Sequence, residues 1–263
     1  MKIVFFGDIV GRGGRRAVRN ILPKLQKKLS PDFVIANVEN LAHGKGITEK
    51  TLNQMEEAGI EAFTSGNHIF QRKEGLEILE KKDTNVLRPA NYPPEAPGIG
   101  YKIFQIRTKK LLLINIIGRV FFREDYDCPF RTMDNILIDT KDEKPDVIIV
   151  DFHKEATSES QAMSYYLDGR ISALIGTHTH VPTADAQIMP QKTAYITDVG
   201  MAGIKESVLG VNKKSVIEHF LTQLPFKYDI IDEGVAEVNY VVIDIDNKGK
   251  AKSIEKGYEE VEV

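Results

Sequence analysis

The N-terminal stretch KIVFFGDIVGRGG, residues 2–14, decides the fold. Its first five residues form an apolar run that ends at Gly7-Asp8, which is the pattern of a strand buried on both faces of a parallel sheet. A glycine-rich loop follows, and residues 14–29 then carry apolar side chains at the spacing of an amphipathic helix. The chain therefore begins with the order strand, loop, helix.

This order is repeated over the first third of the chain. Residues 33–37 (FVIAN) predict a second strand and residues 61–64 a third. Between them, Thr48 is predicted to cap a helix that Gly59 ends. Strands that alternate with helices in this way predict an α/β fold with a parallel sheet.

The rest of the chain is predicted to add further strands. A loop rich in Pro and Gly at residues 91–100 precedes two apolar runs that are separated by a turn, which predicts a β-hairpin. The predicted strands are 101–106 and 111–116 in the hairpin, then 147–152, 172–176, 193–197 and 235–245, with a turn at 247–249 before a last edge strand. The sequence shows no repeat, linker or low-complexity segment, so residues 1–263 are predicted to form a single domain.

The composition excludes several classes of protein. Apolar residues make up 42% of the 263 residues and charged residues 28%, as in soluble globular proteins. A formal net charge of −3 gives no overall attraction to nucleic acid or membranes, although a local basic patch would suffice for a nucleic-acid substrate. Cys128 is the single cysteine, which excludes an internal disulfide and a thiolate zinc site, and we assign it no role. The N-terminal apolar run is too short for a signal peptide or a membrane span, so a cytoplasmic location is expected.

Acidic, amide and histidine side chains recur directly after predicted strands. Because ligands of open α/β sheets bind outside the carboxyl ends of the strands, we expect these side chains to meet in one crevice. They are Asp8, Glu39, Asn40, Asn67, His68, Asp151, His153, His178 and His180. Carboxylate, imidazole and amide oxygen suit Mn, Fe, Zn or Mg, and the set is larger than one ion needs. It predicts a two-metal site, in which ions about 3.5–4 Å apart act on both oxygens of an in-line displacement at phosphorus.

Each of these motifs also has a simpler structural explanation. Asp8 alone can cap a turn, Asn67-His68 can form one, and His153 can be a buried core histidine. The segment His178-Thr179-His180 is more specific, because side chains alternate along an extended segment and both imidazoles would then lie on the same side. The whole constellation indicates a metal site more strongly than any of its parts.

Other basic side chains are predicted to face solvent. His219 falls on the polar face of a predicted helix, whose apolar stripe is Val216, Ile217, Phe220, Leu221 and Leu224. His43 lies in a glycine-bearing loop and is assigned no role. Arg12, Arg15 and Arg16 could contact a phosphate or a partner near a helix start, but a solvated face is the favoured interpretation.

Seven segments together resemble the calcineurin-like metallophosphoesterases, and most closely their YmdB-like branch in bacteria. These segments are GDIVGRGGR (7–15), NVENLAHGKGIT (37–48), TSGNHIF (64–70), RPANYP (88–93), DFHKEATSES (151–160), GTHTHVPTAD (176–185) and YITDVGM (195–201). They follow in the same order over most of the chain. Val10 stands where the wider superfamily has a histidine, and Glu39 stands where it has a bridging Asp.

Three smaller departures from the pattern of the branch are Lys154, Ser160 and Pro182. None of them is a metal ligand in the pattern, so we expect them to affect substrate contacts rather than catalysis.

The resemblance implies two packed mixed β-sheets flanked by helices. It also implies one metal ion bound by Asp8, Glu39, Asn40 and His180, and a second bound by Glu39, Asn67, His153 and His178. Fe or Mn is expected, with Zn or Mg as alternatives. The implied reaction is hydrolysis of 2′,3′-cyclic nucleotides, which are products of RNA cleavage, to nucleoside monophosphates. His68, adjacent to Asn67, is our candidate general acid for the leaving ribose oxygen.

Two other functions remain open. The same metals would serve a phosphomonoesterase or a 3′,5′-cyclic phosphodiesterase. The chain could instead be a regulatory nucleotide- or RNA-binding protein with incidental activity. We further expect a small-molecule cyclic nucleotide as substrate, a link to RNA through that substrate, no membrane association and a homo-oligomer.

Overall fold

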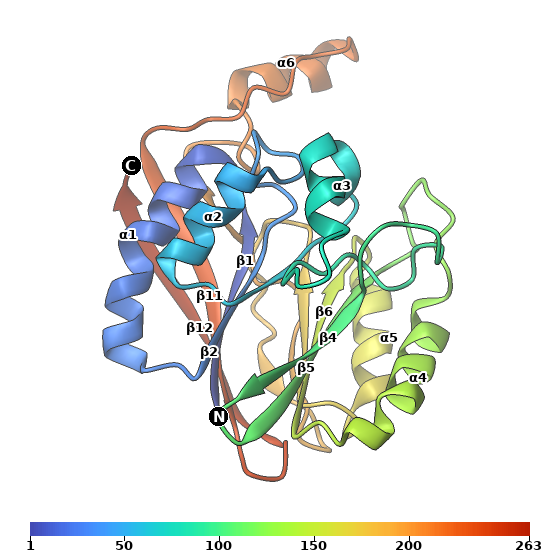
Figure 1. Ribbon diagram of the computed structural model, residues 1–263. Helices are drawn as coiled ribbons and strands as arrows, with labels where there is room; N and C mark the ends of the chain where they lie inside the picture. Colours follow the sequence, from blue (N-terminus) through green and yellow to red (C-terminus); the bar gives the residue numbers. More distant parts are fainter.

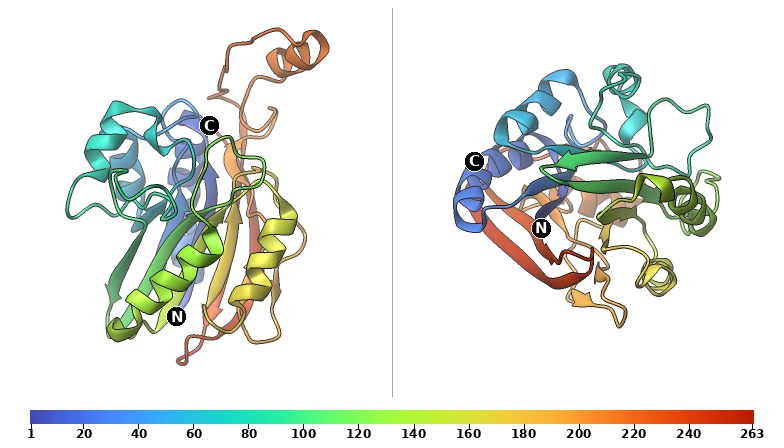
Figure 2. Two further views of the ribbon diagram at one scale, coloured as in Figure 1. Left: turned by 90° about the vertical axis from the view of Figure 1, so that its right-hand side faces the viewer. Right: turned by 60° about the horizontal axis from the view of Figure 1, so that its bottom comes forward.

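A computed structural model describes all residues from 1 to 263 and is shown in Figures 1 and 2. Two six-stranded sheets pack against each other, and helices cover the outer face of each sheet. Each sheet contains both parallel and antiparallel strand pairs. The predicted α/β fold of two packed mixed sheets flanked by helices is therefore confirmed.

The strands follow the sequence predictions closely. The first sheet contains β1 (Lys2–Ile9), β2 (Phe33–Asn37), β3 (Ala62–Thr64), β10 (Met201–Ile204), β11 (Val235–Ile245) and β12 (Ala251–Glu262). The second contains β4 (Tyr101–Ile106), β5 (Lys109–Ile117), β6 (Val147–His153), β7 (Ala173–Thr177), β8 (Gln187–Ile188) and β9 (Ala194–Ile196). The strand orders are β12-β11-β10-β1-β2-β3 and β4-β5-β6-β7-β9-β8.

Six α-helices complete the fold. They are α1 (Gly11–Leu29), α2 (Glu49–Ala58), α3 (Lys73–Leu79), α4 (Pro129–Asp139), α5 (Thr157–Leu167) and α6 (Lys213–Thr222). Short 3₁₀ turns span Ile69–Gln71 and Lys141–Glu143. None of these helices has the length and apolar character that crossing a membrane would require. Helices α3, α4 and α5 and strands β8 and β10 lie outside the sequence predictions.

Side-chain alternation along β1 explains how the layers are held together. Val4 and Phe6 pack under α1, whereas Ile3 and Phe5 point the other way into the core between the two sheets. Both faces of the strand are thus buried, as its continuous apolar run predicts. A third core lies between the second sheet and helices α4 and α5.

Helix α2 shows why the predicted boundaries were correct. The Thr48 hydroxyl accepts a hydrogen bond from the Thr51 backbone N–H at 3.3 Å, which satisfies one of the free donors of the first turn. Gly59 ends the helix in the left-handed conformation, with φ of 105°, which glycine adopts without steric cost.

Helix α6 is present as predicted, but its apolar stripe is mostly exposed. Only Val216 is buried, while Phe220 and Leu221 are 70% and 80% exposed. The helix stands away from the two sheets at the upper end of the molecule (Figures 1 and 2). His219 was predicted to face solvent. Its ring is instead half-buried and stacks on Phe226, with centroids 4.7 Å apart.

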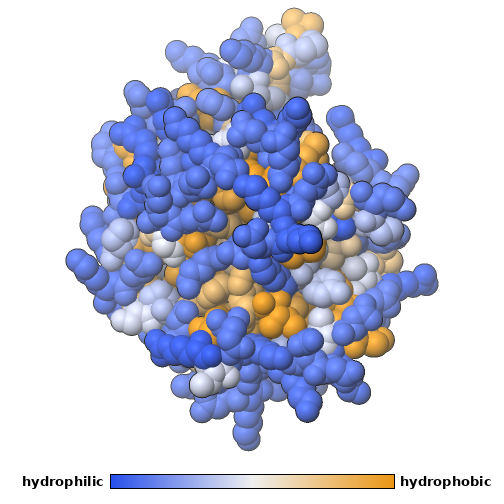
Figure 3. Space-filling view, in the orientation of Figure 1, coloured by the Kyte–Doolittle hydropathy of each residue, from blue (hydrophilic) through white to orange (hydrophobic).

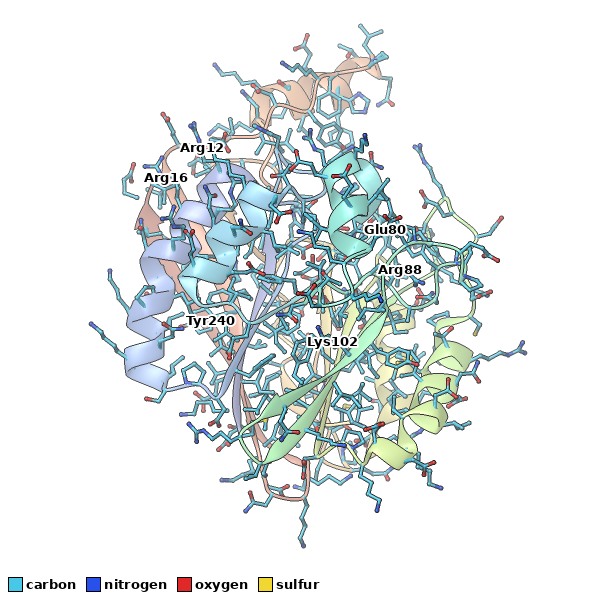
Figure 4. All side chains as sticks on the ribbon, in the orientation of Figure 1. Arg12, Arg16, Glu80, Arg88, Lys102 and Tyr240 are labelled. Carbon is cyan, nitrogen blue, oxygen red and sulfur yellow. The ribbon has the colours of Figure 1, made fainter.

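The arginines at the start of α1 are not equivalent. Arg12 and Arg16 are exposed and project from the helix (Figure 4), as predicted. Arg15 is half-buried, contrary to the prediction of a solvated face. Its guanidinium donates to Gln54 Oε1 at 2.8 Å and to the Leu41 carbonyl oxygen. Arg15 therefore ties α1 to α2 and to the loop that carries the candidate site.

Candidate metal centre

The candidate site residues converge from both sheets. Asp8 comes from the end of β1, Asp151 and His153 come from the end of β6, and the others lie in the loops after β2, β3 and β7. The ends of β2 and β6 are in direct contact, because Asn37 Nδ2 donates to Asp151 Oδ2 at 3.0 Å. The carboxyl ends of parallel strands in the two sheets thus meet at one place, where an α/β fold usually binds its ligand.

One group of donor atoms surrounds Nε2 of His153. This nitrogen lies 3.0 Å from His178 Nδ1 and 3.3 Å from both Asn67 Oδ1 and Glu39 Oε1. Donor atoms of Glu39, His153 and His178 all lie within 4.8 Å of one another. So many Lewis bases in a buried place are unfavourable without a positive charge among them, and this arrangement is typical of a metal site.

A second group of side chains surrounds the amide of Asn40. Its Nδ2 lies 3.2 Å from His180 Nε2, 3.3 Å from Glu39 Oε1 and 3.5 Å from Asp8 Oδ1. His180 Nε2 is 3.8 Å from Asp8 Oδ1. Glu39 Oε1 therefore contacts both groups of side chains, and Glu39 is the residue that the two groups share.

The charges of the site depend on one another. Burial acts to raise the pKa of Glu39, but the imidazoles of His153 and His68 outweigh it and hold that pKa well below its ordinary value. Burial lowers the pKa of His178 to about 3, so its ring is neutral and its nitrogen lone pair is available. Burial opposes protonation of His153 as well, yet the Glu39 carboxylate raises the pKa of His153 to about 9. The pocket thus strongly favours a positive charge beside Glu39.

His68 lies at the edge of these groups. Its backbone N–H donates to Glu39 Oε2 at 2.9 Å, and its Nδ1 lies 2.9 Å from Asn40 Oδ1. The side chain is 27% exposed and faces a cavity of about 460 Å³. Both contacts use Nδ1 or the backbone, which leaves Nε2 available to a ligand in the cavity.

Asp151, which the sequence placed in the crevice, acts as a buried anchor behind His153. Its carboxylate accepts hydrogen bonds from Asn37, from the Thr177 hydroxyl at 2.7 Å and from the Thr64 hydroxyl. Burial raises the pKa of Asp151 to about 7. Thr177 Oγ1 in turn lies 2.9 Å from His153 Nδ1. This network fixes the ring so that Nε2 points at the other donor atoms, as partners of metal-binding histidines commonly do.

The loop that carries His178 and His180 is not extended, so that part of the prediction was wrong. Both residues adopt positive φ, 109° for His178 and 63° for His180, which is uncommon for residues other than glycine. Each imidazole thereby reaches a different donor group. The Thr179 backbone N–H between them donates to Asp198 Oδ2 at 3.0 Å, and this bond holds the loop in its strained form.

Lys154 and Ser160 are fully buried, which corrects the expectation that they affect substrate contacts. Lys154 Nζ lies 3.0 Å from Asp198 Oδ2 in an ion pair that is closed to solvent. Ser160 Oγ accepts a hydrogen bond from the Tyr195 hydroxyl at 3.1 Å. Pro182 is exposed and packs against Gly200. The Lys154–Asp198 pair supports the His178–His180 loop, because Asp198 also accepts the hydrogen bond from the Thr179 backbone N–H.

Removing one partner of this buried pair is expected to destabilise the protein strongly. Asp198→Ala would leave the Lys154 ammonium without its counter-charge and the Thr179 N–H without its acceptor, at a cost of about 3–5 kcal/mol in the free energy of unfolding. The double variant Lys154→Met/Asp198→Asn keeps an acceptor and removes the unpaired charge, so it should lose less. Urea denaturation of the three proteins measures this, and equal losses in the single and double variants would contradict the role of the pair.

Several residues at the site had no signal in the sequence. Glu155 Oε2 lies 3.0 Å from His178 Nε2, and the ring of Phe122 lies 5.0 Å from the His178 ring. The cavity beside the donor groups is also lined by Lys45, Phe226 and Tyr228, which come from loops far apart in the chain. A strand-end pattern cannot identify such residues, because loop paths and not periodicity bring them together.

Comparison with known proteins places this geometry in a family. The sequence model of the family described as YmdB-like protein matches residues 4–256. The chain is 44% identical to a Bacillus subtilis protein named 2′,3′-cyclic-nucleotide 2′-phosphodiesterase, over 95% of this chain and 93% of that protein. Two crystal structures are similar over nearly the whole chain. One is a hypothetical protein from Thermus thermophilus, with a TM-score of 0.92, 38% identity and coverage of 99% of both chains.

The second crystal structure is described as a novel phosphatase from Mycoplasma pneumoniae, with a TM-score of 0.92 and 34% identity, and it covers 100% of this chain and 94% of that one. The family model, the Bacillus subtilis relative and the two crystal structures all match this chain over almost its full length. The motifs noted above lie within the matched residues. The resemblance seen in the sequence is confirmed: this chain belongs to the YmdB-like family.

Proposed function

We propose that this protein is a two-metal phosphodiesterase that hydrolyses 2′,3′-cyclic nucleotides. The observation that carries the proposal is the position of Glu39, whose Oε1 contacts both donor groups at the edge of an open cavity. A carboxylate shared between two sets of ligands is what a two-metal site requires. The name of the Bacillus subtilis relative supports the choice of substrate.

The two donor groups fit two cations. Asp8, Glu39, Asn40 and His180 would hold one, and Glu39, Asn67, His153 and His178 would hold the other. Carboxylate, amide and imidazole donors without thiolate suit Fe or Mn, with Zn or Mg as alternatives. Bound cations of this kind supply a water of lowered pKa and neutralise charge on phosphoryl oxygens.

The Asn40 amide links the metal centre to His68. With its oxygen turned toward a cation, the amide would present an N–H to His68 Nδ1, since the two ends of a carboxamide have nearly the same shape. His68 would then carry its proton on Nε2, on the side of the cavity. We propose that this proton passes to the ribose oxygen as the P–O bond breaks.

The expected product is a nucleoside 3′-monophosphate, because the name of the relative assigns cleavage to the 2′ position. Purified protein should be assayed with 2′,3′-cyclic AMP, 3′,5′-cyclic AMP and a phosphomonoester, with bound metals analysed in the same sample. We expect turnover of the 2′,3′-cyclic substrate at least about 10²-fold faster than of the others, since the relative is named for this substrate and discrimination between substrates is a difference in transition-state binding. Faster turnover of the monoester would favour a phosphomonoesterase instead.

The remaining proposals concern organisation. Residues 1–263 would act as one catalytic domain, because the core between the two sheets contains residues from both halves of the chain. A homo-oligomer in the bacterial cytoplasm remains a proposal, and light scattering of the purified protein measures its mass.

A further inference from the structure

The segment from Val211 to Ile231 forms an arm that carries aromatic side chains over the candidate metal centre. Its base is a short ladder, in which Asn212 N donates to the Asp229 carbonyl at 2.9 Å and Ile231 N to the Gly210 carbonyl at 3.0 Å. Its tip is α6, which stands apart from the sheets (Figure 2). Apolar side chains are visible on this tip in Figure 3, among a mainly hydrophilic surface.

The inner side of the arm is a continuous aromatic wall, which we define as His219, Phe226 and Tyr228. His219 and Phe226 stack with centroids 4.7 Å apart and planes at 27°, and Phe226 and Tyr228 have centroids 4.8 Å apart. Lys45, from the loop after β2, places its ammonium 4.8 Å from the centre of the Tyr228 ring. Aromatic side chains left half-exposed beside a cavity are unfavourable in water and usually mark a ligand site.

One cavity joins this wall to the metal centre. Its lining includes Glu39, His68 and His180 at one side and all three residues of the aromatic wall at the other. Its volume of about 460 Å³ is within the range of roughly 300–1,000 Å³ that is typical of small-molecule sites. A ligand with its phosphate at the metals would therefore extend its remaining part along the wall.

We propose that the aromatic wall is a nucleobase subsite, in which the base of the substrate stacks on Phe226 and Tyr228. This inference rests on the proposed function, which places the phosphate of the substrate but not its base, and it adds where the base binds. Every base has a π-face, so stacking on aromatic rings binds purines and pyrimidines alike. The Tyr228 hydroxyl and the His219 imidazole are the only polar side-chain groups of the wall that could read a base edge, so the subsite selects a nucleobase with little preference for which one. Lys45 holds Tyr228 in place through its cation–π contact.

The test separates the base from the phosphate. Phe226→Ala, Tyr228→Ala and the conservative Phe226→Trp are compared with wild type on 2′,3′-cyclic AMP and on ethylene phosphate, a five-membered cyclic phosphodiester without a base. Leu221→Ala is the matched control, because this α6 side chain is 80% exposed and does not line the cavity. Circular dichroism verifies that each variant is folded.

Each alanine variant should raise KM for 2′,3′-cyclic AMP by about 10- to 100-fold, with kcat nearly unchanged, as expected when stacking on a base is lost. Its kcat/KM on ethylene phosphate should stay within about twofold of wild type. This substrate has no base, and the variants remove no contact to its phosphate. Phe226→Trp and Leu221→Ala should behave like wild type on both substrates. Equal losses on the two substrates, or no change in KM, would overturn the subsite.

A binding measurement keeps this result separate from the proposed function. Equilibrium dialysis with radiolabelled adenosine 3′-monophosphate reports the subsite without turnover. If the wild type fails to hydrolyse either cyclic phosphodiester but Phe226→Ala weakens adenosine 3′-monophosphate binding, the subsite stands and the phosphodiesterase assignment falls. If Phe226→Ala binds this nucleotide as tightly as wild type, the subsite itself is wrong, whatever the activity.

Discussion

Glu39→Ala is expected to lose both metal ions and phosphodiesterase activity by on the order of 10³-fold or more, because two-metal stabilisation of the transition state amounts to several kcal/mol. The reason is geometric. Glu39 Oε1 lies 3.3 Å from His153 Nε2 and 3.3 Å from Asn40 Nδ2, so one carboxylate serves both donor groups. Asp8 also contacts a residue of the other group, but only through the backbone N–H of His178, which donates to Asp8 Oδ2 at 3.1 Å. Metal analysis of the purified variant, together with assays on 2′,3′-cyclic AMP, measures both effects.

The matched control for this variant is Glu57→Ala, which removes an exposed carboxylate from α2 without touching the cavity. It should retain the metals and the activity of wild type. Retention of two ions by Glu39→Ala would contradict the bridging position. Asn67→Ala, which removes a donor from one group only, should lose one ion and keep the other.

His68→Ala is expected to keep both metal ions and to lose about 10²- to 10⁴-fold in rate on 2′,3′-cyclic nucleotides, the usual contribution of a positioned general acid. The ribose oxygen is a poor leaving group that needs a proton. On bis(p-nitrophenyl) phosphate the loss should be much smaller, because p-nitrophenolate leaves without one. The backbone N–H of residue 68, which donates to Glu39 Oε2, is retained in the variant, so the bridging carboxylate stays anchored.

The contrast between the two substrates distinguishes the roles that His68 could have. Loss of an ion would make it a ligand, and equal rate losses on both substrates with the ions retained would make it a substrate clamp. Either result would exclude the general-acid role, while leaving the phosphodiesterase assignment in place.

The sequence predicted the first third of the fold well, because its signals there are local. Apolar runs that end in Gly-Asp or Asn, a threonine cap at Thr48 and a glycine stop at Gly59 depend on backbone chemistry within a few residues. Helices α4 and α5 were missed. Neither begins with a side-chain cap in the structure, although α4 starts with Pro129, a residue common at the first helical position. Helix α1 has no side-chain cap either and was predicted from its apolar spacing.

The sequence also indicated which side chains belong to the candidate site, since polar residues directly after parallel strands must lie at one edge of the sheet. Strand-end position alone could not divide them between two donor groups, and the expected division came from the family resemblance. That division depends on His178 and His180, whose positive φ angles turn neighbouring imidazoles toward different partners. Asp198, which is paired with Lys154, holds this loop through the Thr179 backbone N–H. Nothing in the local sequence connects Asp198 with Thr179.

Helix α6 shows the same limit on a larger scale. Its apolar periodicity predicted a helix with one apolar face. In the fold the helix sits on an arm beyond the sheets, where Phe220 and Leu221 are exposed and His219 turns to Phe226. Periodicity depends on the angle between successive side chains and is therefore set by the sequence alone. What covers an apolar face depends on where distant loops place it, and only the tertiary structure decides that.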